Sequence, residues 1–125
     1  MHEVALMEDI FSIVERDKNK KGFDYVNEIE LIVGDISNVM PDALFMAFDM
    51  LKATGEFTFL REDAQLVLQY EQAEARCTVC KSHYKPDNRF AFCQACHMPS
   101  GEIIKGEVFQ IVSYEGGMHH ESAAQ

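Results

Sequence analysis

The sequence predicts an α+β fold in which two helices pack on a three-stranded sheet and a small zinc-ribbon-like domain is inserted before the last strand. Three observations lead to this prediction. Two segments repeat apolar residues at helical spacing, three segments alternate in the manner of strands, and two Cys-x-x-Cys pairs lie between the second and third of these strands. A chain of 125 residues, 47% of them hydrophobic, can bury one core of ordinary size.

Both predicted helices are amphipathic. From Val4 to Arg16 apolar side chains recur at i, i+3, i+4 and i+7, so this helix begins almost at residue 1, and the run from Lys18 to Gly22 breaks the pattern. A second helix is predicted to begin at Pro41, which suits the first helical position, and to stop at Gly55. The expected apolar stripes are Met7, Ile10, Phe11 and Val14 in the first helix and Leu44, Phe45, Phe48 and Leu51 in the second.

Three strands complete the predicted main domain. The segment Phe23–Val33 alternates with one face buried, after which Gly34 and Asp35 turn the chain. Alternation returns over Ala64–Tyr70, and a third strand over Glu107–Tyr114 is apolar enough to be buried and is placed back in the same sheet. The side chains expected on buried faces are Ile29, Leu31 and Val33 in the first strand and Ala64, Leu66, Leu68 and Tyr70 in the second.

The chain divides accordingly into a main domain and an insertion. Residues 1–72 form the first part of the main domain, residues 73–102 the inserted domain, residues 103–117 the returning strand and residues 118–125 a mobile tail. Residues 1–72 hold 15 acidic and 6 basic side chains, whereas residues 73–125 hold 6 and 5. This difference in charge indicates two separate bodies, joined by neck segments over residues 71–76 and 100–106.

Charge and hydropathy exclude several classes of protein. The formal net charge of −10 speaks against nucleic acid as a partner, because phosphate binding depends on clustered Lys and Arg. No apolar run approaches the roughly 18 residues of a membrane span, and no secretory signal precedes the first helix. We therefore expect a cytoplasmic protein that binds neither nucleic acid nor membrane.

The four cysteines predict a structural zinc site. Cys77 and Cys80 form one pair and Cys93 and Cys96 the other, with twelve residues between the pairs. Two such pairs supply four thiolates in tetrahedral arrangement, which leaves no open position for a water or substrate. Iron of the rubredoxin kind and a thiol-disulfide site are alternatives, but no redox-partner surface is apparent and a redox motif needs only one pair. A zinc ribbon that binds nucleic acid is disfavoured by the acidic balance.

The first residues offer a second metal site. The amine of Met1, the backbone nitrogen of His2 and its imidazole can close fused rings around one ion, and a further backbone nitrogen or imidazole would complete a square plane. Nitrogen-rich square-planar sites suit nickel(II) and copper(II). A histidine at position 2 is more often an accident of a frayed terminus, but the helix predicted from Val4 would fix this terminus against the sheet.

Together these residues resemble the HypA/HybF family of nickel metallochaperones. The resemblance covers nearly the whole chain and rests on Met1-His2-Glu3, Val33-Gly34, the helix from Pro41 and Gly106-Glu107, together with the four-cysteine spacing. It implies that the main domain binds nickel through Met1, His2 and Glu3 and that the inserted domain binds zinc. It also implies delivery of nickel to the [NiFe] hydrogenase large-subunit precursor with a HypB-type GTPase.

Some questions stay open at this stage. His97 follows the fourth cysteine directly and is the better candidate for an accessory part in either metal site, whereas His83 lies three residues after the second cysteine. Urease is a further conceivable recipient of nickel, and a homodimer is compatible with the sequence. The alternative function is a zinc-stabilised interaction module without nickel. A hydrolase is disfavoured, because no nucleophile is paired with a base in a recognisable motif.

Overall fold

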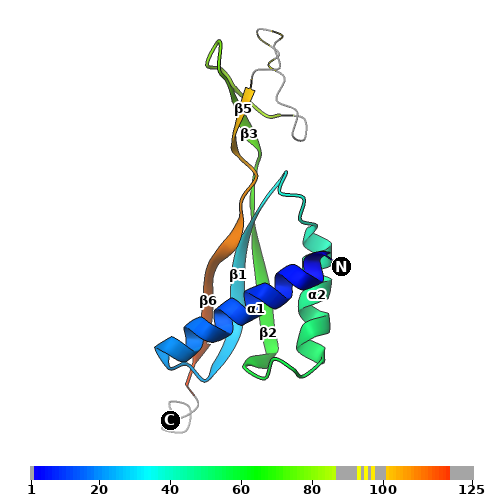
Figure 1. Ribbon diagram of the computed structural model, residues 1–125, viewed down its shortest axis with the longest axis vertical. Coiled ribbons are helices and arrows are strands. Elements are labelled where there is room, and N and C mark those ends of the chain that lie inside the picture. The colour runs from blue at the N-terminus through cyan, green and yellow to red at the C-terminus, as the bar shows by residue number, and fades with distance from the viewer. Residues whose placement is uncertain (1, 87–92, 94, 96, 98–100, 119–125) are drawn as a thin grey trace. The chain divides into compact units, whose positions relative to one another are not determined.

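The structure is a computed structural model that describes residues 2–86, 93, 95, 97 and 101–118, the side chain of His2 excepted. The elements in chain order are α1 (His2–Lys21), β1 (Tyr25–Gly34), α2 (Pro41–Ala53), β2 (Leu60–Glu71), β3 (Glu74–Cys77), β4 (His83–Tyr84), β5 (Gly101–Lys105) and β6 (Phe109–Gly117). They form one sheet of order β2-β1-β6 and a second of order β4-β3-β5 (Figure 1). The α+β prediction, with the last strand returning to the first sheet after an insertion, is confirmed.

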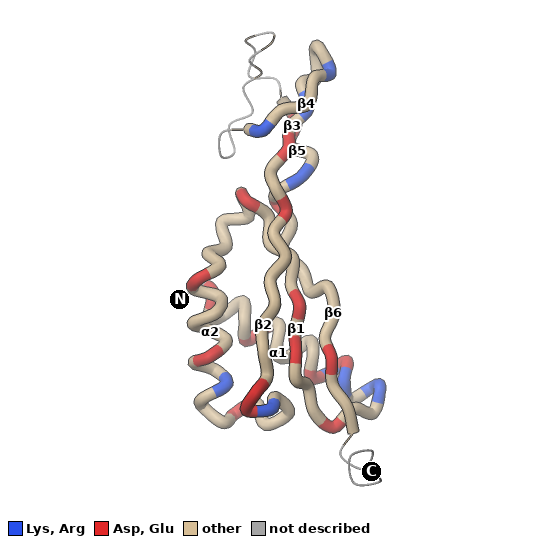
Figure 2. Tube along the Cα trace, turned by 180° about the vertical axis from the view of Figure 1, so that it is seen from behind, with Lys and Arg blue, Asp and Glu red and all other residues tan. Residues whose placement is uncertain are grey.

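The described chain separates into two compact units. The first unit comprises Met1–Leu31, Met40–Leu68 and Ile111–Gln125, and the second comprises Ile32–Val39 and Gln69–Gln110. Acidic residues are spread over the elements of the first unit, while four of its six basic residues lie in the last two turns of α1 and the other two in α2 and β2 (Figure 2). The predicted tail, Met118 apart, lies outside the described residues.

The strand β1 is central in the first sheet and runs parallel to β2. The N–H of Val26 donates to the carbonyl of Phe59 at 2.8 Å near the start of both strands, and the N–H of Asp35 donates to the carbonyl of Glu71 at 3.0 Å near their ends. Residue numbers therefore rise together along the pair. A parallel pair needs a crossover connection, and α2 supplies it.

Helix α1 is longer than predicted. Its four predicted core residues are at most 5% exposed, which confirms the apolar stripe, but the helix continues through the run from Lys18 that we expected to break it. Gly22 ends it with φ +80°, and the N–H of Phe23 donates to the carbonyl of Lys18 at 2.9 Å, as in a Schellman cap. The Lys18 side chain is 9% exposed and its ammonium group donates to Asn19 Oδ1 at 2.8 Å, so it is hydrogen-bonded.

Helix α2 begins at Pro41 as predicted and ends at Ala53. One predicted core residue is wrong: Phe45 is 38% exposed, and the smaller Ala47 is buried in the stripe instead. The buried residues of the helix are Leu44, Ala47, Phe48 and Leu51. Among the described residues, neither helix is both long and apolar enough to cross a membrane.

The core of the first unit is centred on Phe11, which is fully buried. Its ring contacts those of Phe48, Phe57 and Phe59 edge to face, with centroids 5.6, 4.9 and 6.2 Å away. Edge-to-face pairs add a favourable electrostatic contribution to the burial of apolar area. The cluster joins α1 to α2 and to the loop before β2, and α1 crosses one face of the sheet (Figures 1 and 2).

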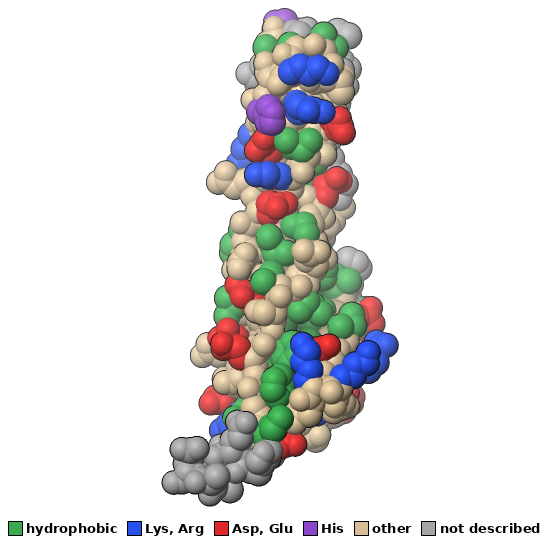
Figure 3. Space-filling model, turned by 90° about the vertical axis from the view of Figure 1, so that its left-hand side faces the viewer, with side chains coloured by type: hydrophobic (Ala, Val, Ile, Leu, Met, Phe, Trp, Pro, Cys, Tyr) green, Lys and Arg blue, Asp and Glu red, His purple; other side chains and the backbone are tan. Residues whose placement is uncertain are grey.

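The buried faces of the strands follow the predicted alternation only in the centre of the sheet. All three predicted side chains of β1 are buried. In β2 the alternation is buried at Ala64 and Leu66, but Tyr70 is 60% exposed. The prediction of a buried third strand is wrong, because β6 lies at the edge of the sheet and its Val112 is 46% exposed. Hydrophobic side chains are accordingly visible on the face drawn in Figure 3.

The second sheet arises where the sequence suggested only neck segments. Strand β3 pairs antiparallel with β4 and with β5, and its Ala75 and Cys77 are fully buried. The opposite face carries charged cross-strand neighbours, in which Arg76 lies between His83 and Glu102. Arg76 and Glu102 carry opposite charges, which stabilises the pairing of β3 with β5. The segments were missed because four and five residues are too few for a clear alternation.

Two glycines allow close backbone approach within the second unit. A Cβ on Gly34 would lie 2.0 Å from the carbonyl oxygen of Gly106, and a Cβ on Gly106, which has φ +108°, would lie 2.6 Å from Cα of Ala73. The N–H of Ile36 donates to that Gly106 carbonyl at 2.9 Å. Any larger side chain at Gly34 would displace backbone, which explains why glycine occupies this turn.

A hydrogen bond fastens α1 to the edge strand of the first unit. The Tyr114 hydroxyl donates to Asp17 Oδ2 at 2.5 Å, and Lys21 Nζ lies 3.1 Å from the same oxygen. Burial, followed by the nearby Asp17 carboxylate, raises the pKa of Tyr114 to about 12. The Tyr114 hydroxyl, followed by Lys21, holds the pKa of Asp17 below its ordinary 3.8.

Replacing Tyr114 by phenylalanine should therefore raise the pKa of Asp17 towards 3.8. A carboxyl whose folded-state pKa is depressed stabilises the fold above its unfolded pKa, and this contribution is lost as the pH falls through the folded pKa. The wild type should thus lose more stability than Tyr114→Phe as the pH falls below 3.8. NMR titration of Asp17 and urea unfolding at several pH values measure both effects. Tyr70→Phe, at an exposed tyrosine, is the control, and an unchanged Asp17 pKa in Tyr114→Phe would refute the assignment.

Candidate metal centre

Three of the four predicted zinc ligands lie together. The sulfurs of Cys77, Cys80 and Cys93 are all within 4.8 Å of one another, and the last two are 3.6 Å apart. Sulfurs of a tetrahedral zinc site with Zn–S bonds of about 2.3 Å lie roughly 3.8 Å apart, whereas those of a disulfide are about 2.05 Å apart. The described thiols therefore fit a shared metal and do not form a disulfide. Cys96 lies outside the described residues.

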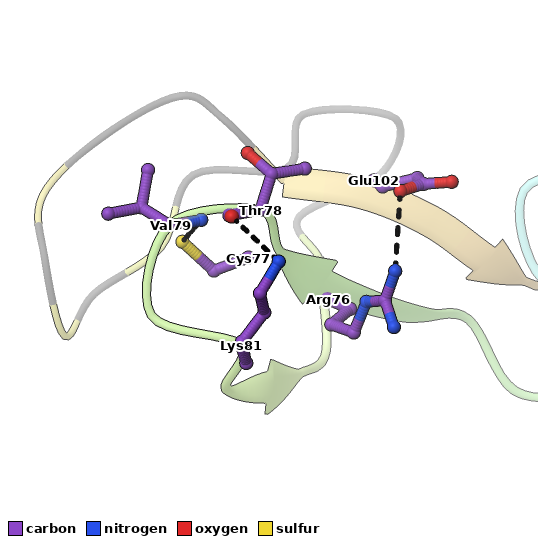
Figure 4. Close-up of polar contacts among 6 residues, drawn as sticks. All are labelled: Arg76, Cys77, Thr78, Val79, Lys81 and Glu102. Carbon is purple, nitrogen blue, oxygen red and sulfur yellow. Dashed lines mark hydrogen bonds and ion pairs between the residues drawn. The ribbon is translucent and has the colours of Figure 1, made fainter.

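Backbone N–H groups hold the first cysteine knuckle, which follows the end of β3. The N–H groups of Val79 and Cys80 donate to the sulfur of Cys77 at 3.4 and 3.5 Å. Lys81 Nζ reaches back to the carbonyl of Thr78 at 3.1 Å and closes the turn from the outside (Figure 4). Donors aimed at a sulfur favour its thiolate form, which is the form that binds a metal.

Both knuckles end in the same backbone conformation. The N–H of Lys81 donates to the carbonyl of Cys77 at 3.0 Å, and the N–H of His97 donates to the carbonyl of Cys93 at 2.8 Å. Lys81 has φ 66° and His97 has φ 57°, in the left-handed region that favours glycine. Each side chain stands four residues after the first cysteine of its pair. The sequence gives no direct sign of this strain, because neither position carries glycine or asparagine.

The three thiols differ in exposure and electrostatic surroundings. Cys77 and Cys93 are buried and Cys80 is exposed. The Ser82 hydroxyl, 3.2 Å from the Cys80 sulfur, is the main cause that lowers the Cys80 pKa from its ordinary 9.0, and the Ser82 backbone adds to it. The lowered pKa favours the Cys80 thiolate, the form that binds a metal, on the exposed side of the cluster.

His83 is engaged away from the thiols. Its Nδ1 contacts Glu74 Oε2 at 2.5 Å across the β3–β4 pair, and this contact is the main cause that lowers the pKa of Glu74. The neighbouring Arg76 and Glu102 form an ion pair at 3.8 Å, also drawn in Figure 4. The contact with Glu74 gives His83 a role in holding β4 on β3.

The predicted nickel residues belong to the start of the first unit. Helix α1 begins at His2, and Glu3 accepts a hydrogen bond through Oε2 from the N–H of Met40 at 3.1 Å. Met1 and the side chain of His2 lie outside the described residues. The bond between Glu3 and Met40 joins residues far apart in sequence, so sequence analysis missed it. The two metal-related regions lie in separate units.

Known proteins resemble this chain over almost its whole length. Residues 1–116 match the family model described as "Hydrogenase/urease nickel incorporation, metallochaperone, hypA". The chain is 31% identical over 116 residues to hydrogenase maturation factor HypA of Moorella thermoacetica, covering 93% of this chain and 99% of that one. It is 30% identical over 115 residues to hydrogenase maturation factor HypA 2 of Bradyrhizobium diazoefficiens, covering 92% and 98%.

Solved structures share the fold. A solution structure of HypA protein superposes with a TM-score of 0.65 at 21% identity, covering 93% of this chain and 96% of that one. The solution structure of the Ni metallochaperone HypA from Helicobacter pylori superposes with a TM-score of 0.62 at 19% identity, covering 94% and 98%. The matched family model, which spans almost the full chain, shows that this protein belongs to the HypA family of nickel-incorporation metallochaperones.

Proposed function

We propose that this protein binds Ni(II) at its N-terminus and delivers it for the maturation of [NiFe] hydrogenase. The ligands would be the amine of Met1, the backbone nitrogen and imidazole of His2, and a fourth donor that completes the square plane. The observation that carries the proposal is that α1 begins at His2 and packs into the core of the first unit. The N–H groups of a first helical turn have no acceptor within the helix, so nickel can displace the His2 amide proton without breaking the helix ladder.

A structural zinc is the second part of the proposal. Cys77, Cys80, Cys93 and Cys96 would hold it, and four thiolates leave no position for a substrate. The convergence of the three described sulfurs supports this assignment. Among the described residues of 69–110, the buried hydrophobic side chains are those of Ala73, Ala75, Cys77 and Cys93, so a metal would supply stability that larger apolar side chains give elsewhere.

His97 is proposed as an accessory residue for metal handling. Its backbone closes the second knuckle, so its imidazole is attached to a fixed turn. His83 is the weaker candidate, because its Nδ1 already contacts Glu74. An imidazole held beside a metal site can tune the ligands or join them.

The proposed partners are a HypB-type GTPase and the [NiFe] hydrogenase large-subunit precursor, in the cytoplasm. Urease is a second proposed recipient, since the matched family model names both enzymes in its description. A homodimer is compatible with this scheme. The surface charge, dominated by acidic side chains in the first unit, suits cations and basic protein surfaces better than nucleic acid or an anionic membrane.

The alternative function is a zinc-stabilised interaction module that binds no nickel. It shares the cysteine cluster with the preferred proposal and differs at the terminus. Such a module would tolerate any change at His2, whereas the metallochaperone would not. Catalysis is not part of either proposal, because a zinc closed by four thiolates offers no site for a reacting group.

The zinc assignment predicts about one zinc per purified chain. Cys77→Ser should release the metal and loosen residues 73–102, because this buried sulfur accepts two backbone hydrogen bonds. Metal analysis by mass spectrometry and amide hydrogen exchange measure both effects. The first unit should keep its exchange protection and serves as internal control. Iron in place of zinc, or an unchanged second unit in the variant, would contradict the assignment.

The proposed role of His97 predicts that its imidazole matters beyond its backbone. His97→Gly removes the ring while relieving a φ of 57°, so zinc content should be kept and nickel affinity should change by about threefold or more. Lys81→Gly makes the same backbone change in the first knuckle, where φ is 66°, and is the matched control. Nickel titration by calorimetry compares the two. Equal affinities in both variants would leave His97 with a turn-forming role only.

The terminal chelate predicts that one or two residues added before Met1 damage nickel binding. An extension turns the free amine into a peptide nitrogen and opens the fused rings, so affinity should fall at least tenfold while fold and zinc content stay unchanged. Calorimetry compares tag-free protein, the same protein with a Gly-Ser extension, and His2→Ala. Equal affinity of the extended and tag-free proteins would exclude the amine as a ligand. Unimpaired binding by His2→Ala would exclude the whole site and favour the interaction module.

A further inference from the structure

The carboxylate of Glu3 lies on the N-terminus of the second helix. Its Oε2 accepts the N–H of Met40 at 3.1 Å. Met40 is the N-cap residue of α2, in an extended conformation with φ −89° and ψ 116°, and it has no side-chain capping bond of its own. Methionine is a poor N-cap residue, since it has no side-chain oxygen to accept a backbone N–H. Glu3 accepts the N–H of the N-cap residue itself, the bond that a Glu at the third helical position makes in a capping box and that Ala43 cannot make here.

Packing alone holds the first turn of α1 only lightly. The first fully buried side chain of the helix is Met7, and Val4 before it is only partly buried. At an axial rise of about 1.5 Å per residue, His2 lies roughly 7.5 Å along the helix from this anchor. A groove of about 230 Å³ separates the start of α1 from α2. It is lined by Glu3, Val4, Ala43, Met46, Ala47 and Met50.

Charge adds to the hydrogen bond. The N-terminus of a helix carries a partial positive charge, so a carboxylate is favoured there. A hydrogen bond from a backbone N–H to a carboxylate is also stronger than one to a neutral acceptor. Glu3 thus has two reasons to stay on α2, and both depend on its ionised side chain. A carboxylate held in this way is oriented towards α2 and away from the task of metal coordination.

We propose that Glu3 is a positioning residue for nickel, whose carboxylate ties the first turn of α1 to the Met40 N–H and thereby orders the terminal chelate. The inference deepens the proposed function and rests on it. A chelate built from consecutive residues binds more tightly when its backbone is already held in place, because less conformational freedom is lost on binding. Glu3 then contributes to nickel affinity through its bond to Met40, and its carboxylate is not a ligand.

The donor of this bond can be removed without touching Glu3. Met40→Pro deletes the N–H, and the φ of −89° at Met40 is close to the range that proline adopts. The carbonyl of Met40, which accepts from Leu44 N–H at 3.0 Å, is retained. Met40→Ala keeps the N–H and loses only the 63% exposed side chain, so it is the matched control. Glu3→Ala removes the acceptor, and Glu3→Gln keeps a neutral one.

Tag-free forms of these variants are titrated with nickel, and the absorption spectrum is recorded at saturation. Met40→Pro and Glu3→Ala should each weaken nickel binding by roughly three- to tenfold, the size expected for one charge-assisted hydrogen bond at an exposed site. The double variant should bind no more weakly than either single variant, because both remove the same bond. Glu3→Gln should fall between them and the wild type. Met40→Ala should match the wild type, and all spectra should be the same.

Two results would overturn the proposal. Wild-type affinity in a folded Met40→Pro variant would show that the bond does not affect nickel. A changed spectrum in Glu3→Ala and Glu3→Gln, with an unchanged one in Met40→Pro, would make the carboxylate a ligand. Should Met40→Pro fail to fold, amide exchange at Met40 in Glu3→Ala decides instead: faster exchange with unchanged nickel affinity would refute the proposal. Failure of the proposed function is distinct, since it appears as unimpaired nickel binding by His2→Ala.

Discussion

The burial of Phe11 among the rings of Phe48, Phe57 and Phe59 is the interaction on which the first unit depends. It fastens α1 to α2 and to the sheet, and α1 carries the start of the chain. A terminus would ordinarily be free to move, but this one continues directly into a packed helix. The proposed nickel chelate would therefore be held in place by the aromatic side chains that pack around Phe11 of α1. The bond from Met40 to Glu3 extends that support beyond the last buried side chain.

The second unit is built on a different physical basis. Its fully buried side chains include Ala75, Cys77 and Cys93, which are small or bear sulfur, and its second sheet has short strands. Its backbone is shaped instead by two cysteine knuckles, which end at Lys81 and His97 in the left-handed conformation. The proposed zinc, held by the converging thiolates, would supply stability that such a unit does not obtain from apolar burial.

Errors in the sequence-based prediction have specific physical causes. The run from Lys18 was expected to end α1, but the side chain of Lys18 bonds to Asn19 and the helix ends in a Schellman cap at Gly22. The third strand was expected to be buried because it is apolar, whereas edge position exposes Val112. The first error has a local cause, the glycine cap, and the second a tertiary one, the edge position of β6. The spacing of apolar residues predicts which face of a strand is apolar. It does not predict whether the strand lies in the centre or at the edge of its sheet.

The sequence by itself determined the stripe of the first helix, most of the stripe of the second, the central strand and the mixed fold class, because each depends on the spacing of residues along the chain. Only the tertiary structure decided how distant segments meet. The close approach of Gly34 to Gly106 explains why glycine occupies both positions, which the sequence alone did not explain. The left-handed turns at Lys81 and His97 are set by closure of each knuckle and not by residue type. The contact of Glu3 with Met40 spans 37 positions, and no local pattern encodes it, since a hydrogen bond between two helices exists only once the core has placed them side by side.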